Sequence, residues 1–154
     1  MVIKADRLPV PGETILGGTF FMNPGGKGAN QAVAAARMGG NVTLISKTGN
    51  DVFGKQSVML YTAENIKTDY IFSDPKHPSG VALITVDAQG ENCIVVASGA
   101  NASLSPSDID KGSTEIESSD LILMQLEIPI ETVEYVAEKA QKKDIKVILN
   151  PAPA

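Results

Sequence analysis

The apolar residues of the chain recur with two spacings, one typical of strands and one typical of helices. Three segments carry apolar residues every three or four positions and are predicted to be helices: 28–38, 51–64 and 129–142. A further short helix is expected after Ser105, with Pro106 at its first position. Shorter segments rich in apolar or β-branched residues are predicted to be strands: 2–5, 14–22, 41–47, 69–72, 81–86, 92–98, 121–126 and 146–149.

The order of these elements predicts an α/β core and a separate small sheet. Strands alternate with helices from Asn41 to Glu64 and again from Leu121 to Leu149, which indicates parallel strands joined by crossover helices. The strands 14–22, 81–86 and 92–98 do not fit such a layer, and the last two are separated by a segment typical of a hairpin connection. The unbroken apolar run 121–126 is typical of a strand covered on both faces.

Composition narrows the class of protein. The 154 residues are 43% hydrophobic and 20% charged, as in an ordinary globular domain, and the formal net charge of −5 argues against nucleic acid or an anionic membrane as a partner. The single cysteine, Cys93, excludes an intrachain disulfide and a multi-cysteine zinc site, so a cytoplasmic location is expected. The first residues are too short and charged for a secretory signal, and no apolar run approaches the ~20 residues of a membrane-spanning helix.

The segment Asn23–Gln31 is the most informative part of the sequence. It follows a predicted strand and opens a predicted helix, so its glycines let backbone approach a ligand while the helix start offers free N–H donors. Lys27 and Asn30 are three residues apart and share one face of the first turn, an arrangement that suits a small molecule rich in acceptors. The alternative is a glycine-rich turn that only starts a helix.

Two other glycine-rich motifs do not match this segment. A phosphate-binding loop requires glycine followed by lysine and then serine or threonine, whereas Gly28 follows Lys27 and Phe21 stands at the first glycine position. The dinucleotide fingerprint fails at Gln31, which disfavours a dinucleotide-binding Rossmann domain.

The sequence Gly25-Gly26-Lys27-Gly28-Ala29-Asn30-Gln31-Ala32, followed by Gly39 and Gly49, resembles the first signature of the ribokinase-like carbohydrate kinase family, of the phosphofructokinase B type. Similarity extends along essentially the whole chain and is closest to the ribokinase branch. Other stretches that carry it are 9–14, 48–54, 98–101, 123–127 and 149–154.

The resemblance implies a fold and a set of sugar-binding residues. The expected fold is a three-layer α/β/α, Rossmann-like core with a small β-sheet lid; the lid strands would cover about 1–8, 14–22 and 79–98, and the core about 24–72 and 104–154. Six residues match sugar-binding positions of the family: Gly26, Lys27, Asn30, Glu127, Ala82 and Val96. From the residues alone, Glu127 could equally be a surface carboxylate, and Ala82 and Val96 could serve only packing.

The resemblance also implies an activity that needs more than these residues. The family phosphorylates sugars with ATP, and D-ribose, at O5, is the expected substrate. We expect the chain to be the amino-terminal part of a longer polypeptide, with the catalytic aspartate beyond Ala154. The ATP, magnesium and monovalent-cation (potassium) sites are also expected mostly outside the chain, which would therefore hold no catalytic residue or metal ligand and show no turnover alone. A homodimer through the lid is expected.

Alternatives remain within and outside the family. The substrate could be another sugar or a nucleoside, as in a fructokinase-like enzyme, or the chain could be a non-catalytic sugar-binding or oligomerisation module. Other polar residues are expected to be structural: Asp51 and Asp87 in turns or caps, and His77 as an exposed loop residue without a partner. Cys93 is expected to be a small packed residue, and the glutamates and lysines of 131–143 to be a solvated helix face.

Overall fold

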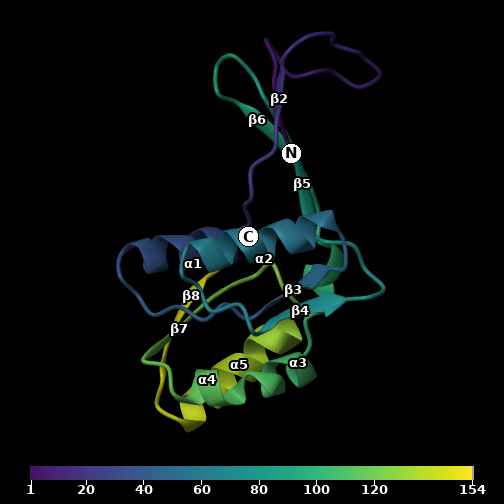
Figure 1. Cartoon of the computed structure of the whole chain (residues 1–154). Helices are drawn as coiled ribbons and strands as arrows, with labels where there is room; N and C mark the ends of the chain where they lie inside the picture. Colours follow the sequence, from purple (N-terminus) through teal and green to yellow (C-terminus); the bar gives the residue numbers. More distant parts are fainter. Residues whose placement is uncertain (154) are drawn as a thin grey trace. The chain divides into compact units, whose positions relative to one another are not determined.

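The chain divides into two compact units. The computed structural model describes residues 1–153 (Figure 1). One unit combines residues 1–24 with 80–97, and the other combines residues 25–79 with the described chain from Ser98 onward. Each unit is therefore built from segments that lie far apart in the sequence.

The first unit is a four-stranded sheet in the order β2-β1-β5-β6. Its strands are β1 (Val2–Lys4), β2 (Thr19–Phe21), β5 (Val81–Val86) and β6 (Asn92–Ala97). β1 runs parallel to β5, and the other pairs are antiparallel. The predicted turn between β5 and β6 is confirmed, since Oδ1 of Asp87 accepts hydrogen bonds from the backbone N–H groups of Gln89 (2.9 Å) and Glu91 (3.0 Å).

The predicted strand 14–22 is wrong in extent, because only Thr19–Phe21 pairs with β1. Gly17 and Gly18 interrupt it with φ angles of 107° and 92°, which belong to no strand. Gly18 also lies against the neighbouring backbone, where a Cβ would stand 2.6 Å from the carbonyl oxygen of Lys4. The β-branched composition of the segment therefore overstates its ability to pair.

The two faces of this sheet carry different residues. Ala82 pairs directly with Val96, so these two lie on one face. Leu83 pairs with Val95 on the opposite face, which also carries Ile3 and Phe20. Those four apolar residues of the second face are between 45% and 63% exposed.

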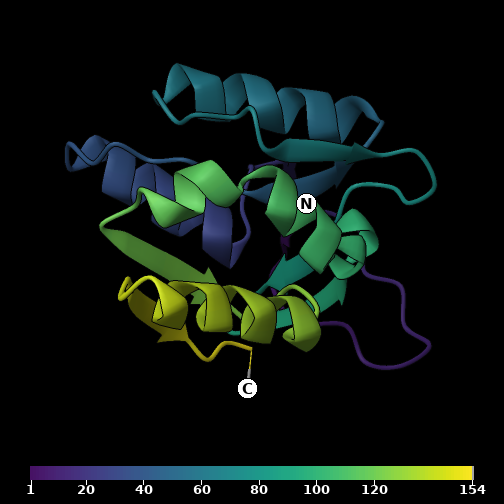
Figure 2. The same ribbon diagram turned by 90° about the horizontal axis from the view of Figure 1, so that it is seen from below.

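The second unit has strands between two layers of helices (Figure 1). Its strands form two parallel pairs, β3 (Ser46–Gly49) with β4 (Ile71–Asp74) and β7 (Leu121–Gln125) with β8 (Lys146–Asn150). Helices α1 (Lys27–Arg37) and α2 (Val52–Ala63) form one layer. The other layer, nearest the viewer in Figure 2, contains α3 (Pro106–Lys111), α4 (Ser113–Glu117) and α5 (Ile130–Lys142). A 3-10 helix spans Gly99–Ser103.

Two hydrophobic clusters on opposite faces of the strands confirm the α/β/α layers. Alternation along a strand sends neighbouring residues to opposite sides. Leu44 and Ile71 pack with α1 and α2 residues in one cluster, while Ile45 and Phe72 pack with the α3–α5 side in the other. Met124 of β7 joins the second cluster, together with Val133 and Val136 of α5.

Several element boundaries differ from the predicted ones. The paired part of segment 41–47 begins only at Ser46, preceded by an isolated bridge between Thr43 and Lys67. The predicted strand 69–72 lies two residues later, at Ile71–Asp74. Helix α4 was not predicted, because it has five residues and no side-chain cap. The 3-10 helix was not predicted either, and its N-cap Ser98 likewise makes no side-chain cap hydrogen bond.

The prediction that strand 121–126 is covered on both faces is wrong for the described chain. Leu121 and Leu123 are 43% and 38% exposed, and Ile148, which pairs with Leu123, is 50% exposed. Helix α5 packs against the other face, where Met124 is buried. Among the described residues, α1 contacts β7 but leaves these three side chains half-exposed.

Candidate functional site

Helix α1 begins at a residue that only glycine suits. Gly26 is the N-cap, with φ 101° and ψ 141°, a conformation that L side chains rarely adopt. Its carbonyl oxygen accepts a hydrogen bond from the backbone N–H of Asn30 (2.9 Å), which closes the first turn. Having no side chain, Gly26 cannot cap the free N–H groups of the helix start.

The carboxylate of Glu127 takes over that capping role. Its Oε2 accepts a hydrogen bond from the backbone N–H of Lys27 (3.0 Å), and its Oε1 accepts one from Nζ of the same residue (2.6 Å). A negative charge here also suits the positive end of the helix dipole. Both side chains remain partly open to solvent, 38% exposed for Lys27 and 28% for Glu127.

Chain topology explains why these residues meet. Glu127 lies two residues beyond the end of β7, and α1 contacts β7 on the face opposite to α5. The carboxyl ends of parallel strands are where open α/β sheets bind ligands. Asn30 is exposed one turn into α1, and its carboxamide makes no hydrogen bond to the described residues. The structure thus brings together Gly26, Lys27 and Glu127, with Asn30 beside them on α1.

The remaining two predicted residues belong to the other unit. Ala82 and Val96 form a cross-strand pair in the β5–β6 hairpin, on the same face of that sheet. Val96 is 59% exposed, so it is not a packed core residue. Their part in a ligand site stays a prediction.

The arrangement of Lys27, Asn30 and Glu127 can bind hydroxyl groups. An ammonium group donates hydrogen bonds, a carboxylate accepts them, and a carboxamide does both. A hydroxyl group donates one hydrogen bond and accepts others, so several adjacent hydroxyls match such a mixed set. Because the Lys27–Glu127 pair is partly exposed, a polar ligand can reach both groups without unfolding the helix start.

Two glutamines beside this pair were not predicted as site residues. Nε2 of Gln125, the last residue of β7, donates a hydrogen bond to Oε1 of Gln31 on α1. Gln125 lies two residues before Glu127, and Gln31 lies four residues after Lys27. The alternation along β7, which turns Met124 toward α5, could have indicated that Gln125 faces α1.

The motif Thr48–Gly54, part of the family resemblance, forms a structural junction. Asp51 is the N-cap of α2 and accepts a hydrogen bond from the backbone N–H of Gly54 (2.9 Å), as predicted for a capping residue. It also accepts hydrogen bonds from the backbone N–H (2.7 Å) and hydroxyl (2.7 Å) of Ser79. The hydroxyl of Ser79 in turn accepts the N–H of Gly49 (3.0 Å). These hydrogen bonds, with Gly54 foremost, hold the pKa of Asp51 below its ordinary value.

A buried group of charges lies where β3 and β4 end. Nζ of Lys47 contacts the carboxylates of Asp108 (2.9 Å) and Asp74 (3.9 Å), and all three side chains are at most 15% exposed. The hydroxyl of Ser103 above all, with two backbone N–H groups, lowers the pKa of Asp74. Burial raises the pKa of Asp108, but hydrogen bonds from Lys47, Lys111 and Ser105 outweigh it, and the pKa lies below its usual range.

His77 is exposed as predicted, but the prediction that it has no partner is wrong. Its Nδ1 lies 3.1 Å from Oδ2 of Asp74. The only local signal for this contact is the three-residue separation of Asp74 and His77 in a proline-containing loop. Cys93, expected to be packed, is exposed on β6.

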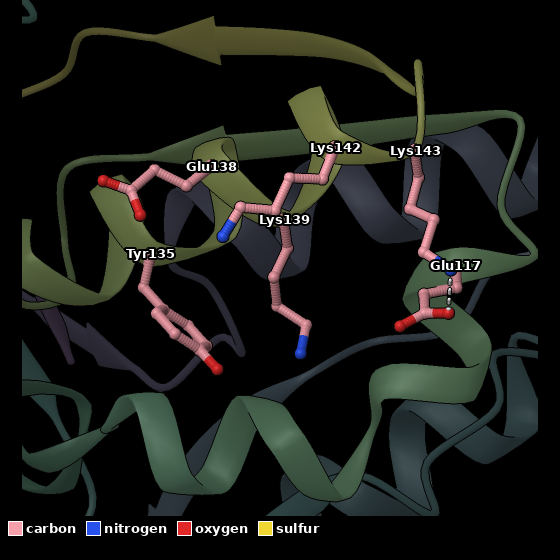
Figure 3. Close-up of a pocket in the computed structure, with 6 residues that line it drawn as sticks. All are labelled: Glu117, Tyr135, Glu138, Lys139, Lys142 and Lys143. Carbon is pink, nitrogen blue, oxygen red and sulfur yellow. Dashed lines mark ion pairs between the residues drawn. The ribbon is translucent and has the colours of Figure 1, made fainter.

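A second surface, on α4 and α5, has the charges of a solvated face rather than of a binding site. Figure 3 shows the cavity there, with Lys143 of this surface paired with Glu117 (2.7 Å). Lys139 pairs with Asp110 (2.8 Å), which also accepts a hydrogen bond from the hydroxyl of Tyr135 (2.6 Å). Most of the positive charge is therefore already neutralised by neighbouring carboxylates.

The described residues show neither a metal-binding cluster nor a membrane-spanning helix. No three side chains of His, Cys, Asp or Glu are grouped so that they could hold a metal ion. None of the helices described has both the length and the apolar composition required to cross a membrane.

Known proteins resemble the chain along its whole length. All 154 residues match the family described as pfkB family carbohydrate kinase. The ribokinase of Bacillus subtilis (strain 168) is 44% identical over 154 residues, covering 100% of this chain and 52% of that protein. The deoxyribokinase of Salmonella typhi is 40% identical over 154 residues, covering 100% of this chain and 50% of that protein.

Solved structures agree with the sequence comparison. The structure of Arabidopsis thaliana ribokinase complexed with ribose and ATP matches with a TM-score of 0.87 at 28% identity, covering 99% of this chain and 50% of that one. The chain thus spans about half the length of the proteins it matches. A match over every residue, with the glycine-rich helix start and the fold in agreement, shows that the chain belongs to the pfkB family of carbohydrate kinases.

Proposed function

We propose that Gly26, Lys27, Asn30 and Glu127 form part of a sugar-binding site and that the sugar is D-ribose. The observation that carries this proposal is the double hydrogen bond from Lys27 to the Glu127 carboxylate at the start of α1. It places a donor, an acceptor and a helix N-terminus within reach of one small polar molecule. The names of the relatives, ribokinase and deoxyribokinase, support a pentose.

Binding requires little rearrangement of these residues. An ion pair that is partly exposed contributes little to stability, since water screens it. Sugar hydroxyls can therefore share or replace the contact between Lys27 and Glu127 at small cost. Gly26 leaves the approach open, because the nearest heavy atom to a Cβ built there is Oε2 of Glu127 at 4.0 Å. Ala82 and Val96, in the other unit, are also proposed as sugar-binding residues that offer apolar contacts.

The activity to which this site contributes is proposed to be ATP-dependent phosphorylation of the sugar, at O5 of D-ribose, in the cytoplasm. ATP is supported as the phosphoryl donor by the relative solved with ribose and ATP. Magnesium and potassium belong to the proposal as cofactors. The described residues contain no group of three His, Cys, Asp or Glu side chains that could hold a metal ion, so none of them is proposed as a metal ligand. What these residues do is bind and orient the sugar.

The chain alone is proposed to have no kinase turnover. The Gly-Ala-Gly-Asp sequence, which the family resemblance links to the anion hole and the catalytic aspartate, does not occur in the 154 residues. Stabilising the transferred phosphoryl group requires such preorganised donors. Finding this sequence downstream of Ala154 in the coding sequence would support a kinase over a non-catalytic sugar-binding module.

A homodimer through the sheet of residues 1–24 and 80–97 is also proposed. All six residues of β6 are exposed, and the face with Ile3, Phe20, Leu83 and Val95 is apolar. Exposed apolar patches of this kind mark interaction surfaces. The opposite face, which carries Ala82 and Val96, would stay available for the sugar.

Calorimetric titration of the chain tests the sugar proposal. D-ribose is compared with 2-deoxy-D-ribose, D-fructose and adenosine, and circular dichroism confirms that each variant is folded. We expect saturable binding of D-ribose that falls at least about tenfold in Lys27→Ala and Asn30→Ala, the size expected for one lost charged or neutral hydrogen bond. Lys55→Ala, at an exposed lysine of α2, is the control. A folded chain that binds none of these molecules, or binds them equally in all variants, would contradict the proposal.

A further inference from the structure

Gly28 leaves the space in which the Gln125 side chain lies. A Cβ at Gly28 would stand 2.8 Å from Oε1 of Gln125 and 3.7 Å from its Cδ. The first distance is too short for a carbon and an oxygen that are not bonded, so alanine here would push the glutamine away. Alanine is otherwise the better helix former. The contact with Gln125 therefore gives a physical reason for glycine inside the first turn of α1.

The Gln31–Gln125 hydrogen bond and the Lys27–Glu127 pair join the same two segments. Lys27 and Gln31 lie four residues apart on one side of α1, about 6 Å along the helix axis. Gln125 is the last residue of β7, and Glu127 lies two residues further on, in the bend that follows the strand. Both contacts form together, with α1 running opposite to the direction of the chain from Gln125 to Glu127.

The Gln31–Gln125 hydrogen bond is suited to fix the position of the Lys27–Glu127 pair. Lys27 and Glu127 are partly exposed and joined by a salt bridge that water screens. Both contacts are partly buried, but the carboxamide contact involves the last residue of the strand, where the backbone is held by pairing with Asn150 of β8. Glu127 lies in the bend beyond the strand, where no such pairing holds its backbone.

We infer that Gln31, Gln125 and Gly28 position Lys27 and Glu127 for ligand binding. The carboxamide pair sets how α1 stands against the end of β7, and Gly28 provides the slot that this pair requires. These three residues are positioning residues: they act through Lys27 and Glu127. The consequence for affinity rests on the proposed sugar function, whereas the positioning itself does not.

Variants of Gln31 separate the hydrogen bond from simple packing. Gln31→Leu keeps the approximate volume but removes the acceptor, whereas Gln31→Glu keeps an acceptor for Nε2 of Gln125. We expect D-ribose affinity to fall about tenfold in Gln31→Leu, the effect of one lost hydrogen bond, and to be largely restored in Gln31→Glu. Gln56→Leu, at an exposed glutamine of α2, is the matched control and should bind like the parent chain.

A double-mutant cycle tests the slot at Gly28. Gly28→Ala should weaken D-ribose binding, because the added methyl group displaces Gln125. Gln125→Ala removes the group that the methyl would meet, so the double variant should bind no worse than Gln125→Ala alone. Additive losses would show that Gly28 acts independently of Gln125 and would overturn this part of the inference.

A readout without sugar keeps the test separate from the proposed function. In ¹⁵N-labelled chain, the backbone amide resonance of Lys27 reports its hydrogen bond to Glu127, and we expect it to shift in Gln31→Leu and return in Gln31→Glu. If the parent chain binds no ribose but the Lys27 resonance shifts in Gln31→Leu and returns in Gln31→Glu, the sugar proposal is contradicted and the positioning role is supported. If Gln31→Leu leaves both the resonance and the affinity unchanged in a folded chain, the inference is overturned.

Discussion

The carboxylate of Glu127 accepts hydrogen bonds from both the backbone N–H and the ammonium group of Lys27, a residue 100 positions earlier in the chain. One side chain therefore caps helix α1, neutralises a lysine and joins the end of β7 to the glycine-rich segment. The cap is external because Gly26, which stands at the N-cap, has no side chain. Glycine at that position thus allows the positive φ angle, and Glu127 supplies the capping carboxylate that a glycine N-cap cannot.

Gly26→Ala is expected to destabilise the chain and weaken sugar binding together. The φ of 101° is strained for any residue with a Cβ, and holding it costs about 1–3 kcal/mol of unfolding free energy. Gly25→Ala is the matched control, because no atom lies within 4 Å of a Cβ there and its φ is not in the positive range. Urea denaturation of both variants measures the difference; equal stabilities would contradict the strain.

Ser79→Ala is expected to loosen the junction between α2 and the end of β3. The substitution removes the acceptor for the N–H of Gly49 and one donor to the carboxylate of Asp51, so we expect a loss of about 2 kcal/mol. Ser73→Ala, at an exposed serine of β4, should cost far less. Chemical denaturation of the two variants makes the comparison, and a similar loss in both would argue against the junction.

Acid is expected to destabilise the chain through Asp74 and Asp108. Folding lowers the pKa of both carboxyls, so their ionised forms stabilise the folded state. That contribution is complete well above the unfolded-state pKa of about 3.9 and is lost as the pH falls through the lower folded-state values. Unfolding free energy measured from pH 7 to pH 3 should stay nearly level to about pH 5 and then decline.

Lys47→Met tests the same buried group of charges by removing its cation. It leaves Asp108 without its closest buried cation, and losing one member of such a pair costs about 3 kcal/mol near pH 7. Because the pKa of Asp108 then rises, the decline in acid should become shallower than in the parent chain. Lys55→Met is the exposed control. A parallel pH profile in Lys47→Met would contradict the assignment.

Val95→Lys is expected to dissociate the proposed homodimer. Val95 is 63% exposed on the face that carries Leu83, and a charge there cannot be buried against a second copy at low cost. Sedimentation equilibrium should show a dimer for the parent chain and a monomer for this variant. Val52→Lys, at an exposed apolar residue of α2, should leave the dimer intact. A monomeric parent chain would contradict the proposal.

Local sequence predicted those elements whose signals lie within a few residues. The capping serine and proline at 105–106 predicted α3, and the structure adds the reciprocal hydrogen bonds with Asp108. The apolar spacing of 129–142 predicted α5 to within one residue. The extent of strand 14–22 was overestimated, because pairing depends on a partner strand that the segment itself does not show. Gly17 and Gly18 were the local signal against a strand there, since glycine weakens strands.

The site was only partly accessible from sequence. The glycine-rich segment pointed to Gly26, Lys27 and Asn30, and the family resemblance pointed to Glu127. Neither predicted that Lys27 and Glu127 bind each other, or that Gln31 and Gln125 meet beside them, because these contacts join positions about a hundred residues apart. The contacts of Lys47 with Asp74 and Asp108 could not be predicted for the same reason, because these partners lie on other elements.

A titration of ¹⁵N-labelled chain with D-ribose, followed by two-dimensional NMR, tests the central claim most directly. We predict saturable shifts at the backbone amide of Lys27 and the side-chain amide of Asn30, with the α4–α5 lysine surface unchanged. Glu127→Gln, which removes the charge but keeps the shape, should weaken the response. A folded chain whose Lys27 and Asn30 resonances stay fixed at saturating D-ribose would contradict the account.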